Sequence, residues 1–172
     1  FSMHYKNKLG FSLIELLITM ALLAAFITIA TPSYFSLIEN IRIISLNEKL
    51  LANLNYARTS SVLKNKTVEI CGSSDGYQCD GQWSRGWVSR FIESDSVISQ
   101  EKVNTQEQLR WDGISNSIRF HGNGTSPLGN GRFYICRRNG EVARQIVINR
   151  QGRNRLVIGL ESKQNQATGC GS

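Results

Sequence analysis

Arginine is the residue type whose number and spacing point most directly to chemistry in this sequence. The chain carries a formal net charge of +7. That surplus lies between residues 119 and 155, where eight arginines and no lysine are accompanied by a single acid, Glu141. A guanidinium group forms forked hydrogen bonds with phosphate or carboxylate. The segment therefore indicates either a surface that binds polyanions or an exposed basic face that only aids solubility.

The densest part of this segment is NRQGRNRLVIGL at residues 149–160. Gly152 is expected in a turn, and Arg153 and Arg155 then lie on the same side of an extended strand. Their guanidinium groups would be about 7 Å apart, close to the spacing of phosphates along a nucleic-acid strand. We expect nearby turns and strands to add four more arginines to this surface: Arg132, Arg137, Arg138 and Arg150.

Residue combinations typical of catalysis are missing from the sequence. His4 lies near the N-terminus, and the other histidine, His121, lies in RFHGNG, which is typical of a turn. There is no HExxH, no GxSxG, no phosphate-binding loop and no pair of candidate catalytic acids. We therefore expect no enzyme activity and no cofactor, and a membrane-tethered enzyme is the least supported alternative.

The four cysteines predict disulfides rather than a metal site. Their spacing lacks the close pairs of a zinc ribbon, and four cysteines allow three disulfide connectivities. Cys71 and Cys79 flank the polar loop GSSDGYQ, which a disulfide would close. Cys136 and Cys170 are then left to pair and to attach the C-terminal tail to the core. This interpretation favours an oxidising compartment, whereas the alternative is four reduced thiols in a cytosolic chain.

An apolar run from Phe11 to Ala30 precedes all of these residues. As a helix it would be about 30 Å long, which matches the hydrocarbon core of a bilayer. It is too long for a signal peptide and no clear A-x-A cleavage site follows it, so we expect a retained span. Lys6 and Lys8 lie before the run and indicate a cytoplasmic N-terminus. The one acid within the run, Glu15, is costly in a bilayer unless it is paired.

The remaining pattern predicts an α+β fold. After Pro32, which is expected to kink or loosen the helix, apolar residues recur at helical spacing to about Lys64. Short runs of β-branched and aromatic residues then alternate with turn signals, among them Asn139-Gly140. We expect a transmembrane helix at 11–31, an amphipathic helix at 32–66, and an antiparallel β head at 67–172 that packs on the helix.

The residues KLGFSLIELL at positions 8–17 resemble the prepilin signature of type IV pilins and type II secretion pseudopilins. The resemblance implies a leader peptide, residues 1–10, that a prepilin peptidase cleaves after Gly10, and methylation of the new N-terminal residue, Phe11. It implies that Glu15 pairs with the N-terminal amine of a neighbouring pilin subunit during assembly. It also implies a single-pass inner-membrane protein with a periplasmic head, which later joins a pilus at the cell surface.

The head is similar to that of the FimT/GspH group of minor pilins and pseudopilins, through QWSRGWVSRF, IRFHGNG, GRFYIC and IVINRQGRNR. In the FimT branch a G-R-x-R motif is linked to DNA binding during natural transformation, and it maps onto Gly152, Arg153 and Arg155. The resemblance implies a minor pilin that binds extracellular DNA without sequence preference. The alternative is a structural minor pilin or GspH-like pseudopilin that initiates filament assembly, whose arginine face contacts acidic partner subunits.

Overall fold

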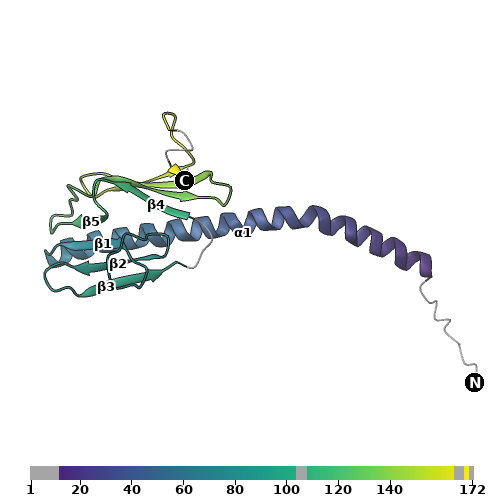
Figure 1. Ribbon diagram of the computed structural model, residues 1–172, viewed down its shortest axis with the longest axis horizontal. Helices are drawn as coiled ribbons and strands as arrows, with labels where there is room; N and C mark the ends of the chain where they lie inside the picture. Colours follow the sequence, from purple (N-terminus) through teal and green to yellow (C-terminus); the bar gives the residue numbers. More distant parts are fainter. Residues whose placement is uncertain (1–11, 104–107, 165–168, 171–172) are drawn as a thin grey trace, which may run out of the picture. The chain divides into compact units, whose positions relative to one another are not determined.

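The computed structural model of the protein describes residues 12–103, 108–164 and 169–170 (Figure 1). Within these residues an α-helix, α1 (Leu13–Lys64), precedes eight β-strands. The boundary between the two compact units of the chain falls after Ile38, inside α1. The leader at 1–10 and the residues Gly10 and Phe11 lie outside the described residues.

The first unit contains the N-terminal part of α1, which is apolar and solvent-exposed. The N–H of Glu15 donates to Ser12 Oγ at 3.3 Å, so Ser12 caps the helix and Glu15 lies in its first turn, where an acid is favourable. Every described side chain as far as Leu37 is exposed, and the helix is long and apolar enough to cross a membrane. It continues through Pro32, which removes one backbone hydrogen bond without ending the helix.

The strands of the second unit form two antiparallel sheets; the sequence pattern predicted an antiparallel β head without indicating this division. Sheet A has the strand order β3-β2-β1-β5 and sheet B has the order β4-β6-β7-β8. The strands of sheet A are β3 (Val97–Lys102), β2 (Gly86–Phe91), β1 (Val68–Gly72) and β5 (Ser117–Phe120). The strands of sheet B are β4 (Gln108–Gly113), β6 (Gly131–Cys136), β7 (Val142–Ile148) and β8 (Asn154–Ile158).

One apolar face of α1 closes the core of the head. Its buried residues recur at intervals of three and four, the spacing of a single helix face. They share one cluster with Trp87 and Phe120 of sheet A and with Phe133 and Ile146 of sheet B. Each fully buried side chain of this size contributes roughly 1.5–3 kcal/mol to stability. The apolar residues of this helix face are Ile43, Leu46, Leu50, Leu54 and Ala57.

The structure contains both disulfides that the cysteine spacing favours. Cys71 is bonded to Cys79, and Cys136 is bonded to Cys170, 34 positions along the chain. A second, smaller apolar cluster surrounds the latter bond, where Tyr134 and Cys136 pack against Leu160 and Cys170. The C-terminal segment is thereby held against sheet B.

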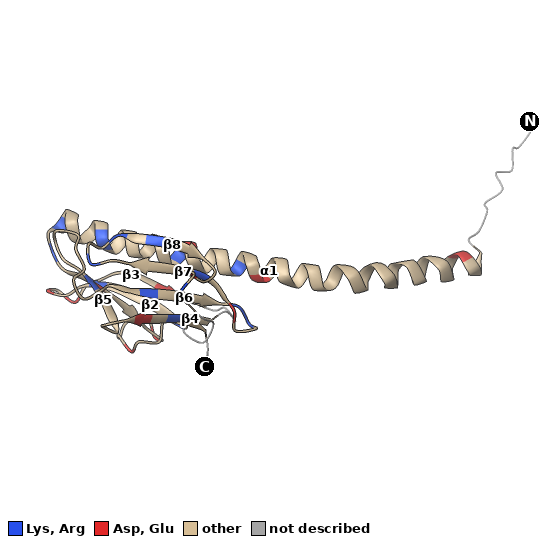
Figure 2. Cartoon of the chain, turned by 90° about the horizontal axis from the view of Figure 1, so that it is seen from above, with Lys and Arg blue, Asp and Glu red and all other residues tan. Residues whose placement is uncertain are grey.

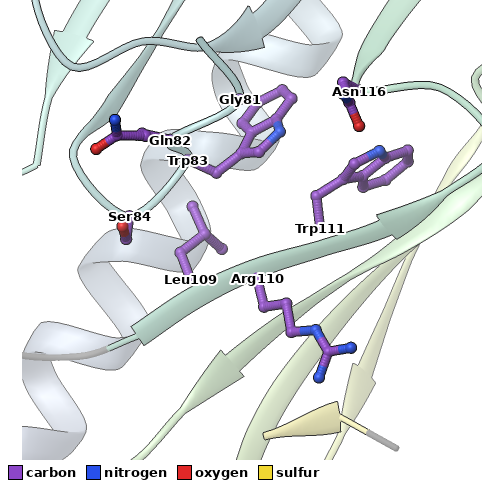
Figure 3. Close-up of a pocket in the computed structure, with 8 residues that line it drawn as sticks. All are labelled: Gly81, Gln82, Trp83, Ser84, Leu109, Arg110, Trp111 and Asn116. Atoms are coloured by element: carbon purple, nitrogen blue, oxygen red, sulfur yellow. The ribbon is translucent and has the colours of Figure 1, made fainter. Parts of the chain in front are cut away.

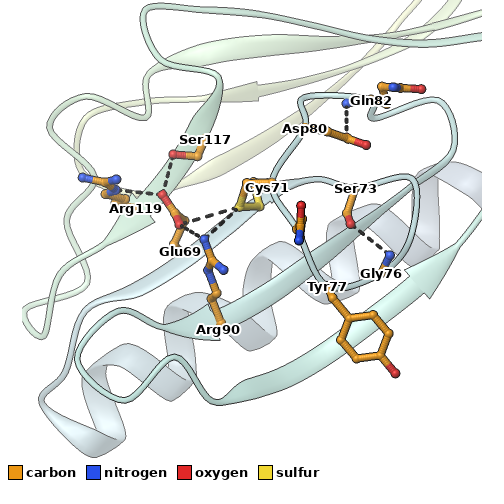
Figure 4. The surroundings of a disulfide bond; sticks show 12 residues. Glu69, Cys71, Ser73, Gly76, Tyr77, Asp80, Gln82, Arg90, Ser117 and Arg119 are labelled. Carbon is orange, nitrogen blue, oxygen red and sulfur yellow. Dashed lines mark hydrogen bonds and ion pairs between the residues drawn. A yellow bond between two sulfur atoms is a disulfide. The ribbon is translucent and has the colours of Figure 1, made fainter.

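A buried acid links three strands of sheet A (Figure 4). Glu69 on β1 lies opposite Arg90 on β2 and Arg119 on β5. Its carboxylate accepts hydrogen bonds from Arg119 Nε at 2.9 Å, Arg90 Nη2 at 3.2 Å and Ser117 Oγ at 2.8 Å. The Sγ atoms of Cys71 and Cys79 are also near this carboxylate, but they are joined in the disulfide and are not thiolate ligands.

These bonds decide the protonation of Glu69. Burial by itself raises the pKa of its carboxyl, but the hydrogen bonds from Ser117, Arg119 and Arg90 and the charge of Arg119 outweigh burial and hold the pKa below the ordinary value of 4.5. A carboxyl whose pKa is lower in the folded state stabilises the fold above its unfolded pKa. That contribution is lost as the pH falls through the folded pKa.

We therefore expect Glu69→Gln to lower the free energy of unfolding at pH 7 by about 2 kcal/mol, because it removes a buried carboxylate that accepts hydrogen bonds from Ser117 and two arginines. The loss of stability below pH 4.5 should also become shallower. Urea denaturation of both proteins between pH 3 and pH 7 measures both effects, with the exposed Glu141→Gln as control. Parallel stability curves for wild type and E69Q would contradict this assignment.

A candidate nucleic-acid interface at the β7–β8 turn

The turn between β7 and β8 is organised by Asn149. The N–H of Gly152 donates to the Asn149 carbonyl oxygen at 2.9 Å, and the N–H of Asn149 donates to the Arg153 carbonyl oxygen at 3.1 Å. The side-chain oxygen of Asn149 accepts a further bond from the N–H of Arg153 at 3.0 Å. An asparagine that bonds its own turn in this way restricts the backbone. The turn presents Arg150 and Arg153 with exposed side chains.

Gly152 is required at its position for two reasons. Its φ is +72°, in the left-handed region that L side chains rarely adopt. A Cβ atom there would also lie 2.3 Å from the carbonyl oxygen of Gly124. The glycine of the G-R-x-R sequence therefore lets the turn pack directly onto the loop at residues 121–126.

Arg58 of α1 attaches both of these loops to the helix. Its Nε donates to the Gly124 carbonyl oxygen at 3.0 Å and its Nη2 donates to the Gln151 carbonyl oxygen at 3.3 Å. The N–H of Ser126 donates to the Arg150 carbonyl oxygen at 2.9 Å and joins the two loops to each other. Sequence reasoning missed Arg58, because no local pattern signals contacts 66 and 93 positions along the chain.

Arg132 and Arg155 lie on the same face of sheet B, next to the turn. Both residues are register partners of Val147, on either side of β7. Each binds one oxygen of Glu161: Arg132 Nη1 at 2.7 Å from Oε2 and Arg155 Nη2 at 2.7 Å from Oε1. Sequence reasoning missed Glu161 because it lies six positions after the arginine-rich segment. No local sequence pattern indicates that it pairs with Arg132 and Arg155.

Arg137 and Arg138 lie elsewhere, so the prediction that they join the same surface is wrong. They belong to the β6–β7 turn, and β7 has seven residues, which separates the two turns by roughly 20 Å. In consecutive antiparallel hairpins, successive turns lie at opposite ends of the shared strand. Arg137 Nη1 is 3.7 Å from Glu39 Oε2, and the backbone N–H of Arg138 donates to Glu39 Oε1 at 3.0 Å.

Part of the arginine surplus is therefore neutralised by acids from outside the segment. Arg119, Arg132, Arg137 and Arg155 form ion pairs with Glu69, Glu39 or Glu161. Figure 2 marks the basic and acidic positions along α1 and the strands. Four arginines of the segment form no ion pair with another described residue: Arg138, Arg144, Arg150 and Arg153.

A separate hollow of about 350 Å³ lies beside β4 (Figure 3). The rings of Trp83 and Trp111 are 6.2 Å apart between centroids, and the Trp111 N–H donates to the Ser115 carbonyl oxygen at 2.6 Å. Because β4 and β8 form opposite edges of sheet B, this hollow is not part of the arginine surface. His121 lies in the loop beside the β7–β8 turn, where its backbone N–H donates a hydrogen bond to the Thr125 carbonyl oxygen at 2.9 Å.

Comparison with known proteins identifies the family. Residues 47–152 match the family described as type II transport protein GspH. This chain belongs to the GspH family. Residues 5–31 match the prokaryotic N-terminal methylation motif, and no curated protein matches the chain. The GspH match ends at Gly152, so it does not include Arg153, Arg155 or Glu161.

Two solved structures of the type IV minor pilin FimU from Pseudomonas aeruginosa strain PAO1 resemble this GspH-family chain. The structure in space group P21 has a TM-score of 0.56 at 23% identity and covers 69% of this chain and 90% of its own. The structure in space group P65 has a TM-score of 0.52 at 26% identity and covers 66% and 90%. The α+β prediction is confirmed as the type IV pilin fold.

The GspH-family chain is accordingly a minor type IV pilin or pseudopilin, which is a structural and non-enzymatic kind of protein. Its methylation motif implies processing by a prepilin peptidase. The apolar N-terminal helix anchors such a pilin in the inner membrane before it assembles with other pilin subunits into a pilus at the cell surface.

The packing of Gly152 predicts a difference between two glycines with similar backbone angles. Gly140 in the β6–β7 turn has a φ of +81°, and a Cβ atom added there would meet nothing within 4 Å, whereas one added at Gly152 meets the Gly124 carbonyl oxygen. We expect Gly140→Ala to cost about 1 kcal/mol of unfolding free energy and Gly152→Ala to cost roughly 3 kcal/mol, since it adds a steric clash. Denaturation curves of the two variants measure the difference, and equal costs would contradict the close approach.

Proposed function

We propose that this GspH-family minor pilin binds extracellular DNA without sequence preference through the β7–β8 turn, for DNA uptake in natural transformation. The observation that carries the proposal is the exposure of the Arg150 and Arg153 side chains and their lack of ion pairs with other described residues. Both side chains are exposed on a turn that Asn149 and Arg58 hold in place. Neither forms an ion pair with another described residue. Because the backbone of the turn is already held in place, little further ordering of the backbone is needed when the two arginines bind an anion.

Arg155 extends this surface along β8. It lies two positions after Arg153, the last residue of the turn before β8, so the Cα atoms of the two arginines are at most about 7 Å apart. The Arg155 side chain is 61% exposed, and an exposed ion pair such as that with Glu161 is worth little, so a phosphate can replace the carboxylate. Arg132 is 21% exposed and adds a cation on the same sheet face.

Such contacts reach phosphates rather than bases. The turn carries no aromatic side chain between residues 149 and 155, so stacking on bases does not contribute there. Binding by phosphate contacts is independent of sequence and weakens steeply with salt. Arg137 and Arg138 would contact DNA only as a second site at the far end of β7.

The N-terminal part of the proposal concerns processing and assembly. We propose cleavage between Gly10 and Phe11, methylation of Phe11, and pairing of Glu15 with the N-terminal amine of a neighbouring subunit. The residues Lys8 to Gly10 and the following apolar run support it, together with the methylation motif at 5–31. In an apolar filament core an amine and a carboxylate are each costly alone and tolerable as a pair.

We expect Gly10→Leu to block this cleavage, because a peptidase that accepts only glycine before the cut excludes a bulky side chain. Cells that produce a prepilin peptidase would then keep the unprocessed chain, heavier by the leader and lacking the added methyl group. Intact-mass spectrometry measures this, with Lys6→Gln in the leader as the control. Normal trimming of G10L would refute the proposed site.

DNA binding is tested by Arg153→Gln with Arg155→Gln in the full chain, kept in neutral detergent. We expect two lost phosphate contacts to weaken binding to labelled duplex DNA roughly 50-fold at 0.1 M salt and to flatten the slope of log K against log salt by about 1.8. Fluorescence anisotropy across a salt series measures both quantities.

The matched control is Arg42→Gln with Arg85→Gln, which removes the same charge from two exposed positions away from the turn. Thermal melting should be unchanged in both double variants. If R42Q/R85Q weakens binding as much as R153Q/R155Q, binding follows net charge and not this turn. If the wild type ignores DNA at low salt, the arginines are left to contact acidic surfaces of partner subunits, as in a purely structural minor pilin or pseudopilin.

A further inference from the structure

We propose that Glu161 acts as an intramolecular competitor of DNA, because its carboxylate occupies the place of a backbone phosphate between Arg132 and Arg155. Glu161 would then set the affinity and the salt response of the interface. This inference rests on the proposed function, and it adds a residue that neither the sequence motif nor the GspH match includes.

The geometry around Glu161 is that of a bound anion. Its two oxygens are divided between two guanidinium groups, with Oε2 2.7 Å from Arg132 and Oε1 2.7 Å from Arg155. Two neighbouring guanidinium groups would hold the non-bridging oxygens of a phosphate in the same manner. A phosphate and this carboxylate therefore cannot occupy the position together.

The backbone around Glu161 is fixed. The N–H of Gly159 donates to the Ala143 carbonyl oxygen at 2.9 Å, and the N–H of Glu161 donates to the side-chain oxygen of Gln164 at 3.0 Å. The Cys136–Cys170 bond attaches the later part of the segment to β6. The carboxylate is thus held near the arginines at a high effective concentration, which an external phosphate must overcome.

A buried amide keeps Arg132 ready for an external anion. Gln145 is fully buried, and its Oε1 accepts a hydrogen bond from Arg132 Nη1 at 2.6 Å. Its Nε2 donates to the Gly159 carbonyl oxygen and to Gln164. Because Gln145 is neutral, it orients the guanidinium of Arg132 without neutralising it. If the Glu161 carboxylate moves away, Arg132 keeps its position and regains its unpaired charge.

The carboxylate stays ionised under ordinary conditions. Hydrogen bonds from Arg132 and then Arg155 hold the pKa of Glu161 below its ordinary value. The competition therefore operates at neutral pH. Arg150 and Arg153, which have no such partner among the described residues, would make the first contacts with DNA, and Arg155 and Arg132 would follow as the phosphate displaces Glu161.

The test is Glu161→Gln in the full chain in neutral detergent, with fluorescence anisotropy on a labelled duplex across a salt series. E161Q removes one negative charge that opposes the phosphate bound by Arg132 and Arg155, so it should tighten binding about eightfold at 0.1 M salt and steepen the slope of log K against log salt by about 0.9, the effect of one phosphate contact. An unchanged affinity and slope would overturn the inference.

The matched control is Glu141→Gln. It changes the net charge by the same amount at an exposed acid just before β7, at the far end of that strand, which forms no ion pair with another described residue. We expect less than a threefold change in affinity. An equal gain in E141Q and E161Q would show that overall charge is responsible and would overturn the inference.

Two further variants complete the design. The gain in DNA affinity from Glu161→Gln should fall by at least half when it is measured in an Arg155→Gln background, and an undiminished gain would contradict the competition.

If E161Q unfolds, Glu161→Asp serves instead. Its shorter side chain keeps the charge but cannot reach both guanidinium groups, so it should tighten DNA binding partially. If wild type and E161Q both fail to bind at low salt, the proposed function fails; if the wild type binds and E161Q matches it, only the role of Glu161 fails.

Discussion

The constraint on which the head depends is the single apolar face of α1 that closes a core shared by two sheets. Leu50, Leu54 and Ala57 are fully buried there. Arg58 follows directly on the same helix and reaches the loops at 121–126 and 149–153. Burial of the helix face therefore also places the side chain that holds the candidate interface, so the position of the arginine turn is linked to the packing of the core.

Charge pairing limits how much of the basic surplus is available to a partner. Glu69 is shared by two arginines within sheet A and Glu161 by two arginines on sheet B. At Glu161 one carboxylate offsets two guanidinium groups and leaves a local positive charge, whereas at Glu69 a second acid, Asp95, also pairs with Arg90. The difference is exposure: the side chain of Glu69 is 8% exposed, so its role is structural, whereas Glu161 is accessible to competition from solvent anions.

Most of the fold was accessible to sequence reasoning because its signals are local. The apolar run from Phe11, the helical spacing to Lys64 and the turn signals between strands each reflect a short-range periodicity. Local signals also predicted the turn at Gly152 and the disulfide across the GSSDGYQ loop. The division of the strands into two sheets was not accessible, because β5 pairs with β1 and β4 pairs with β6 through long-range contacts.

By itself, the sequence determined the membrane-length helix with its early acid, the α+β class, the disulfide-forming cysteines and the concentration of arginine near the C-terminus. Tertiary structure alone decided which arginines are neighbours and which are neutralised. Arg137 and Arg138 are separated from the β7–β8 turn because hairpin turns alternate between the ends of a sheet. Glu161 and Arg58 join the site because side-chain partners are chosen by distance in space, and a linear pattern carries no information about that distance.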